Sequence, residues 1–466
     1  MTGRPKPKRE IRLNAFSMNA VGHQSPGLWR HPRDRSAEFN RLGYWMELAK
    51  TLEAGLFDGL FLADVLGAYD VYGGSPDAAL RHGTQIPSND PSLLVPAMAA
   101  ATTHLGFGVT SNLSYEPAFP FARRMSTLDH LTDGRVGWNV VTGYLDSAAR
   151  AAGLARQRGH DERYAVAEEY MDVVYSLWEG SWDDDAVVRD RARGVFTEPS
   201  RVRPARYRGA HVSVDAVHLS QPSPQRTPVL YQAGSSPAGR VFAARHAECV
   251  FVSGPSARAI APRVADIRRL AAEAGRDPAA ITIFALATVV TGPTDAAAEA
   301  KLADYRRYVS HEGALTLMSG WTGVDFSSYG LDQTVTHVRT EAGRSAMENI
   351  TRADPSRVWT VREVAEHVGV GGVGPVFVGA PSTVADLMES WIAATGVDGF
   401  NLAAAVAPES FEDVAEHVVP ELQRRGRYKR AYAPGTLREK LTGGGPRLPA
   451  RHPAAGFRTL PVEAVE

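Results

Sequence analysis

Apolar residues along the chain follow two alternating periods, one typical of strands and one typical of helices. The strand pattern occurs in eight segments, namely 11–17, 57–63, 105–111, 136–142, 229–233, 249–253, 281–290 and 399–406. Helical spacing occurs over 39–54, 91–103, 119–131, 163–178, 237–246, 257–274, 295–309, 384–394 and 411–424. Strands that alternate with helices predict a parallel α/β fold, and eight strands favour a closed TIM (β/α)₈ barrel over an open doubly wound sheet.

The length exceeds what a barrel needs. The chain has 466 residues, whereas a TIM barrel takes about 250. Two stretches interrupt the alternation: 180–227 is rich in Pro, Arg and Asp, and 313–374 is irregular and rich in Gly, Ser and Thr. We expect one barrel domain over 1–466, with these stretches as insertions, 313–374 as a lid, and 427–466 as a tail with little core material that wraps over the barrel or a partner subunit.

Charge and cysteine content exclude several functions. Lys and Arg total 51 and Asp and Glu total 52, a net charge of −1, so no field attracts nucleic acid or an anionic membrane. The single cysteine, Cys249, excludes an intramolecular disulfide and a cysteine zinc site, and its apolar surroundings predict a buried strand. No apolar segment follows the basic start of the chain, so we expect no signal peptide and a cytoplasmic protein. We expect no metal centre.

A glycine-rich string at 369–374 matches the G-x-G-x-x-G pattern of dinucleotide-binding loops. Such a loop must follow a strand and open a helix. This string follows a helical stretch and leads through Pro375 into an apolar segment, so we interpret it as a flexible linker.

Candidate chemistry gathers where the predicted strands end, which is where a barrel carries its active site. Asp64, Thr110 and Asn139 lie at or beside the ends of three strands. Ser235 and Ser236 stand at the start of a helix, which suits either a phosphate or an ordinary helix cap, and the residues alone do not decide between them. His160 and Tyr164 share a helix face where an anion would fit, although a capped helix start is the simpler interpretation.

Long strings of this sequence resemble the bacterial-luciferase-like flavin monooxygenases, in the branch of nitrilotriacetate, dibenzothiophene-sulfone and long-chain alkane monooxygenases. They occur at 14–16, 22–23, 27–32, 62–65, 123–132, 138–142, 160–164 and 221–228. The resemblance runs along nearly the whole chain. It implies a TIM barrel, a homodimer or homotetramer, and reduced FMN supplied by a separate NAD(P)H:flavin reductase.

The resemblance also implies which residues bind the flavin. The FMN positions would be Asp64, Thr110, Asn139, His160, Arg163, Tyr164, Ser235 and Ser236. Asp64 and Asn139 would lie near the ring. The phosphate would be held by His160, Arg163, Tyr164, Ser235 and Ser236, which favours the phosphate interpretation left open above. Reduced FMN and O₂ would form a C4a-hydroperoxide, and the protein would position a substrate and exclude water.

Three further positions match catalytic residues of the alkane monooxygenases: His23, Tyr69 and Gln85. Two depart from that pattern, because Ala20 replaces a Cys and Leu317 aligns with a His. We expect the substrate pocket to include Phe16, Ala20, Trp29 and Leu317, and we assign Trp138 to the barrel core.

The predicted substrate is a small apolar molecule such as a long-chain alkane. An organosulfur compound or a specialised-metabolite precursor is the alternative within the family. A deazaflavin-dependent oxidoreductase and a non-catalytic flavin-binding protein are the alternatives outside it.

Overall fold

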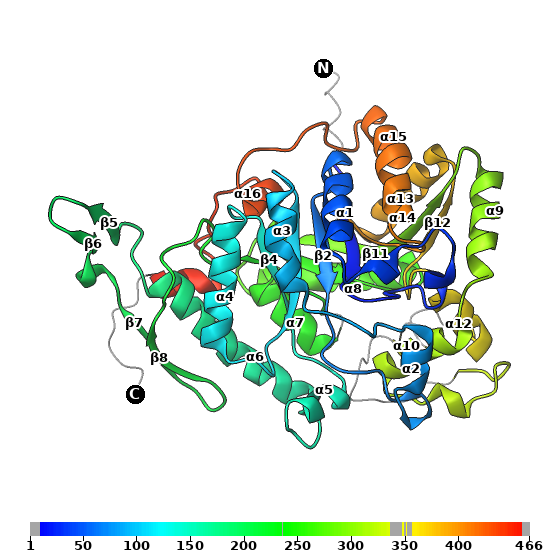
Figure 1. Cartoon of the computed structure of the whole chain (residues 1–466), viewed down its shortest axis with the longest axis horizontal. Coiled ribbons are helices and arrows are strands. Elements are labelled where there is room, and N and C mark those ends of the chain that lie inside the picture. Colours follow the sequence, from blue (N-terminus) through cyan, green and yellow to red (C-terminus); the bar gives the residue numbers. More distant parts are fainter. Residues whose placement is uncertain (1–9, 235, 336–346, 349–350, 352–356, 459–466) are drawn as a thin grey trace.

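The protein is built on a closed barrel of parallel strands (Figure 1). The computed structural model describes residues 10–458 except 235, 336–346, 349–350 and 352–356. The barrel order is β10–β9–β4–β3–β2–β1–β13–β11, and β11 pairs with β10 to close it. The bounds are β1 Arg12–Met18, β2 Gly59–Ala63, β3 Gly106–Asn112, β4 Val136–Val141, β9 Val229–Gln232, β10 Cys249–Val252, β11 Thr282–Thr291 and β13 Gly399–Ala403. The prediction of a TIM barrel is confirmed.

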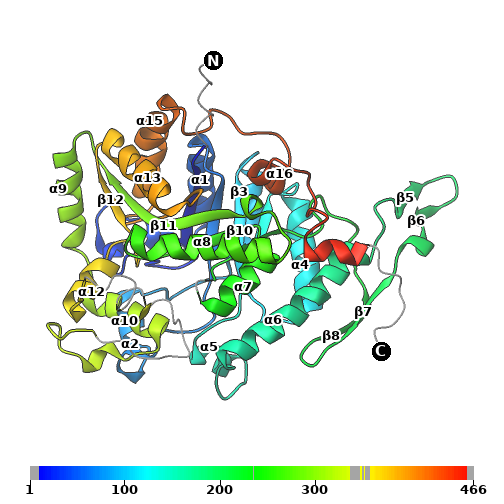
Figure 2. The same ribbon diagram turned by 180° about the vertical axis from the view of Figure 1, so that it is seen from behind.

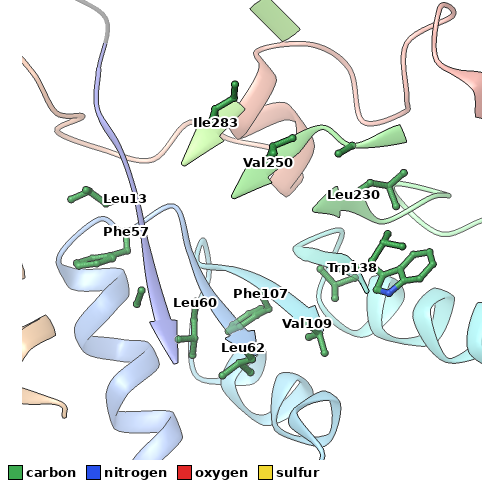
Figure 3. Packing of buried hydrophobic residues seen from close by; sticks show 14 of the residues in the cluster. Leu13, Phe57, Leu60, Leu62, Phe107, Val109, Trp138, Leu230, Val250 and Ile283 are labelled. Carbon is green, nitrogen blue, oxygen red and sulfur yellow. The ribbon is translucent and has the colours of Figure 1, made fainter. Parts of the chain in front are cut away.

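Helices cover the outside of the barrel because every strand presents apolar side chains outward. Figure 3 shows such residues from successive strands, among them Leu60, Phe107 and Leu230, in the layer beneath the helices. The surrounding helices are α1 Leu42–Ala54, α3 Val95–Ala100, α4 Ala118–Leu131, α6 His160–Tyr175, α7 Pro237–His246, α8 Ala257–Glu273, α9 Asp295–Arg306, α13 Pro381–Thr395, α14 Glu409–Asp413 and α15 Val419–Arg424. Trp138 lies in this layer, fully buried, as predicted.

The barrel interior is filled partly by the C-terminal tail. Inward-facing residues of four strands form a separate cluster that includes Phe61, Tyr231 and Phe284, and Cys249 is buried among them, as predicted. Leu437 and Leu441 of α16 (Leu437–Thr442) belong to the same cluster. The expectation that the tail holds little core material is therefore wrong, because α16 closes the amino end of the barrel.

The stretch 180–227 forms two antiparallel hairpins. β5 (Val187–Asp190) pairs with β6 (Val195–Thr197), and β7 (Pro204–Arg208) pairs with β8 (Ser213–Val217). Figures 1 and 2 show both hairpins extending from the side of the barrel next to α4 and α6. This arm uses much of the surplus length.

The stretch 313–374 is more regular than predicted. It contains most of α10 (His311–Thr322) and all of α12 (Val361–Val368), which pack against each other near α2 (Asp77–His82). The string 369–374 is a buried turn, not a flexible linker. Gly371 has φ +81°, a side chain there would collide with Thr288, and its N–H donates to Ser25 Oγ at 3.0 Å. The string opens no helix but leads to β12 (Val376–Gly379), which pairs with β11.

Within the described part of the chain, we find no helix long and apolar enough to cross a membrane.

Candidate active site

A cavity of about 300 Å³ lies at the carboxyl ends of the barrel strands. Phe16, Asp64, Thr110 and Asn139, four residues singled out from the sequence, all line it. Its other walls are mainly apolar and include Phe251, Leu286, Trp321 and Val373. The strand ends thus bring together residues that are far apart in sequence, as a TIM barrel does.

One side of this cavity presents hydrogen-bond acceptors that have no partner. Asn139 donates from Nδ2 to Thr110 Oγ1 at 3.0 Å, so its Oδ1 is the remaining polar atom of this amide. Among the described residues, Asn139 Oδ1 and Asn401 Oδ1 are buried without a hydrogen-bond partner. Buried acceptors are usually satisfied, so these two amides point to a ligand that carries N–H donors.

Asp64 lines the same cavity with an altered proton affinity. Burial, together with the nearby charge of Asp90, raises the pKa of the Asp64 carboxyl to about 7. The hydrogen bond from the Val65 N–H opposes this shift only in part. Near neutral pH this carboxyl therefore holds a proton in a large fraction of molecules and can act as a donor or an acceptor.

A second cavity of about 230 Å³ adjoins the first and extends it toward α6 and α7. Both cavities are lined by Asp64, Val141, Tyr144 and Ala233. The second continues to Tyr164 on α6 and to Gln232 at the end of β9. The two form one elongated space, with the broader part in the barrel mouth.

Tyr164, which lines the second cavity, connects it to the start of α7. Ser236 caps the helix, because its Oγ accepts from the Gly239 N–H at 3.1 Å. His160 Nε2 lies 3.1 Å from the same Oγ, and Tyr164 also hydrogen-bonds to Ser236. An imidazole, a phenol and a hydroxyl therefore converge on a helix N-terminus, where an anion is stabilised.

The other two residues predicted to hold the phosphate, Arg163 and Ser235, are not seen in this cradle. Arg163 donates to the backbone carbonyl of Gly143 and so contacts the loop after β4. Ser235 lies outside the described residues.

Tyr144 is a residue that the sequence analysis missed. It lines both cavities, and its hydroxyl oxygen lies 2.6 Å from that of Tyr69. Tyr69 donates to Gln85 Oε1 at 2.9 Å, and Gln85 Nε2 donates to the His23 carbonyl at 2.7 Å. Tyr69 and Gln85 thus reach the cavity through Tyr144. Its place directly after the strand-end string 138–142 was a signal that pointed to it.

The direction of this chain follows from the Gln85 amide. Because a carbonyl oxygen only accepts, Tyr69 uses its proton toward Gln85, and Tyr144 must donate to Tyr69. The indole of Trp321 also hydrogen-bonds to both phenols. Burial raises the pKa of Tyr69 to about 12 and holds the pKa of Tyr144 well above its ordinary value, so both stay protonated.

His23 lies behind the main cavity. Its ring packs edge-on against Phe16, with 4.3 Å between centroids, and its Nε2 lies 3.3 Å from Gln24 Nε2. Burial lowers the pKa of His23 to about 3, so the imidazole is neutral. It lines a small cavity of about 30 Å³, and Phe16 lines both spaces.

Three residues predicted for the substrate pocket do not line the main cavity. Ala20 and Trp29 line the small cavity beside His23, because the first loop passes behind Phe16. The Trp29 side chain reaches the surface, where its indole donates to the His82 carbonyl at 3.0 Å. Leu317 is buried among the apolar residues around Tyr69, and Trp321, one turn further along α10, faces the cavity instead.

Polar strand ends and an anion cradle at a following helix are typical of barrel enzymes that bind a phosphate-bearing ligand. Comparison with known proteins identifies the family. Residues 20–399 match the family of luciferase-like monooxygenases, and the chain belongs to this family. The resemblance stated from the sequence and the prediction of a monooxygenase are confirmed.

The particular relatives share most of the chain. Dimethyl-sulfide monooxygenase of Hyphomicrobium sulfonivorans is 50% identical over 452 residues, covering 97% of this chain and 94% of the relative. Long-chain alkane monooxygenase of Geobacillus thermodenitrificans is 46% identical over 453 residues, covering 97% and 99%. The crystal structure of DmoA from H. sulfonivorans matches with a TM-score of 0.90 at 49% identity, covering 97% of this chain and 96% of that one. Riboflavin lyase RcaE, solved with modified FMN and riboflavin, matches with a TM-score of 0.89 at 35% identity, covering 97% and 100%.

Proposed function

We propose that this protein is a two-component monooxygenase that uses reduced FMN and O₂ to oxygenate a small apolar molecule. One observation carries the proposal: an apolar cavity with unpartnered amide acceptors adjoins a second space that reaches Tyr164, which hydrogen-bonds to Ser236 in the anion cradle. A flavin nucleotide has this sequence of parts, with a flat ring that bears N–H groups at one end and a phosphate at the other.

The residues present fit FMN. Asn139 Oδ1 and Asn401 Oδ1 would accept from ring N–H groups, and Asp64 would lie at the ring edge. Ser236, His160 and Tyr164 would hold the phosphate at the start of α7. A structure similar to this one contains modified FMN. When bound, reduced FMN supplies the reaction with O₂.

The chain's own residues then have three tasks. Phe16, Phe251, Leu286 and Trp321 exclude water from the cavity and contact the apolar substrate. Asp64 holds a proton near neutral pH. Tyr144 offers its oxygen to the cavity as an acceptor, and Tyr69 and Gln85 are positioning residues that set the direction of its O–H bond.

The cavity supports a small substrate. Ligand pockets range from about 300 to 1,000 Å³, and this one, at about 300 Å³, lies at the lower limit before a flavin ring enters it. The two relatives described above are named for dimethyl sulfide and for long-chain alkanes. A small organosulfide therefore stands beside an alkane as a substrate candidate.

Two further parts of the proposal rest on the resemblance. A separate NAD(P)H:flavin reductase would supply reduced FMN, and the protein would be a cytoplasmic homodimer or homotetramer. Light scattering coupled to gel filtration measures the assembly directly.

The experiment that tests the function supplies the protein with FMN, NADH and a flavin reductase under ¹⁸O₂. We expect one ¹⁸O atom in the product of dimethyl sulfide or of a medium-chain alkane, with more turnover on the sulfide. Formation of hydrogen peroxide alone on both substrates would favour the flavin-binding protein. Reduction of a substrate by a reduced deazaflavin in the absence of O₂ would favour the alternative of a deazaflavin-dependent oxidoreductase.

A further inference from the structure

A second polar cavity lies at the opposite, amino end of the barrel. Its volume is about 360 Å³. Arg12 and Asp58 contribute to it from the starts of β1 and β2, and the rest of its wall includes tail residues Lys429, Arg430 and Lys440. Since the tail forms much of this wall, the cavity exists only because the tail folds back across the barrel.

Positive charge in this cavity exceeds negative charge. Four cations line it, against the two carboxylates of Glu10 and Asp58, which leaves two positive charges uncompensated. Asp58 Oδ1 lies 3.0 Å from Arg12 Nη1 and 2.7 Å from Lys429 Nζ, and Asp58 Oδ2 accepts from the Leu13 N–H at 2.8 Å. One carboxylate therefore serves two cations.

Lys440 lacks even a shared carboxylate. Its Nζ donates to the His104 carbonyl at 3.0 Å, and among the described residues it has no ion-pair partner. Burial and the charges of Arg135 and Lys429 lower the pKa of Lys440 to about 8, and the charges of Glu53 and Glu439 oppose this shift only in part. The Tyr432 ring has Lys429 Nζ at 5.4 Å and Lys440 Nζ at 5.8 Å from its centroid. Two partly buried ammonium groups thus flank one ring, and they have no carboxylate beyond the Asp58 that Lys429 shares with Arg12.

We propose that this cavity binds a phosphate dianion, separately from the flavin site. A phosphate group carries about −1.5 to −2 charges at pH 7 and three acceptor oxygens, which matches the two uncompensated cations and their donors. Leu437 and Leu441 form an apolar part of the wall that would contact the organic portion of a phosphate ester. The ligand would join the tail to the barrel through Lys440 and Arg12.

The test titrates the FMN-saturated protein with inorganic phosphate in a calorimeter, with chloride at matched ionic strength as the reference. FMN keeps its own phosphate cradle filled. We expect one saturable phosphate site per chain. Lys440→Gln should weaken it at least tenfold, whereas Lys50→Gln, which removes an exposed lysine on α1, should leave it unchanged. A second titration uses phenyl phosphate in place of phosphate. Tighter binding of phenyl phosphate than of phosphate would indicate a phosphate ester as the ligand, and equal binding would indicate the free ion.

A second variant makes the test independent of the Lys440 contact with His104. Ala433→Glu places a carboxylate at the exposed edge of the cavity. It should abolish phosphate binding and raise the melting temperature of the phosphate-free protein, because it supplies the missing anion. Absence of saturable binding to the native protein, or the same isotherm for the native protein, Lys440→Gln and Ala433→Glu, overturns the proposal.

Discussion

Asp58 and Asp64 lie at the two ends of strand β2, and their surroundings shift the pKa values of their carboxyls in opposite directions. Asp58 is 4% exposed and sits between Arg12 and Lys429, which keep the pKa of its carboxyl below the ordinary value despite burial. Asp64 has the charge of Asp90 nearby, and burial raises its pKa to about 7. Burial acts on both in the same sense, so the neighbouring charges decide the outcome.

The comparison extends to the two ends of the barrel. The amino end uses its charged groups to hold the tail, as Arg438 of α16 also does with Glu248 at 2.6 Å. The carboxyl end keeps His23 and the two tyrosines neutral, and the Oδ1 atoms of Asn139 and Asn401, which line its cavity, have no hydrogen-bond partner in the described residues. Satisfied polar groups stabilise the fold, whereas unsatisfied ones are available to ligands.

Asp58→Asn should give the largest effect. Removing one partner of a buried ion pair costs about 3–5 kcal/mol in the free energy of unfolding, and here two cations lose their carboxylate. Urea denaturation measures this. Asp386→Asn, at an exposed pair with Arg425, is the control and should cost less than about 1 kcal/mol.

The lowered pKa of Asp58 predicts how the stability loss of Asp58→Asn changes with pH. A carboxyl whose pKa is lower in the folded state adds stability above its unfolded pKa of about 4, and this stability is lost as the pH falls through the folded value. The deficit of Asp58→Asn should therefore shrink in acid. A deficit that stays constant between pH 6 and pH 2.5 would show that the charge of Asp58 does not matter.

Ser236→Ala should weaken FMN binding about 10- to 100-fold, since it removes a hydrogen bond to a charged phosphate. Ser256→Ala is a matched control, because Ser256 caps α8 in the same way that Ser236 caps α7. Both variants should lose a similar amount of stability, about 1 kcal/mol. Fluorescence titration of FMN separates them, and equal affinities would place the phosphate elsewhere.

Tyr144→Phe should lower the oxygenation rate about tenfold, because it removes the hydroxyl by which a cavity-lining residue joins the phenol chain. Tyr170→Phe is the control, since the Tyr170 hydroxyl is buried without a partner in the described residues and lies in the outer core. Product formation at saturating substrate measures the difference. Unchanged turnover in Tyr144→Phe would exclude the phenol chain from the reaction.

Asp64→Asn should differ from the unsubstituted protein in how its stability changes with pH. Between pH 4 and 7 the folded protein retains a proton on Asp64 that the unfolded chain has lost, so the native protein loses stability as the pH rises. The Asp64→Asn variant lacks this titrating carboxyl. Its free energy of unfolding should therefore rise relative to that of the unsubstituted protein between pH 4 and 7. Parallel pH profiles of the two unfolding free energies would contradict the raised pKa.

The sequence predicted what local patterns encode. The barrel follows from the alternating periods, and Asp64, Thr110 and Asn139 reach the cavity because strand ends meet at one edge. Short helices such as α16 were missed, since six residues with two apolar positions give a weak periodic signal. The Asp58–Lys429 contact joins residues 371 positions apart, which no local pattern encodes. No local pattern shows that Ala20, Trp29 and Leu317 lie outside the lining of this cavity, because the path of a loop and the rotation of α10 decide which side chains face it.

The pairing of β1 with β13 has a consequence for how the chain is made. Arg12 lies opposite Gly399, so the first strand of the barrel can complete its pairing only after the last barrel strand has been synthesised. At about 5–20 residues per second, a ribosome needs roughly 20–80 s between them. During that interval Leu13, Ala15 and the edge of β1 have no neighbour on that side, and chaperones that bind exposed apolar strands have a window in which to act on the nascent chain.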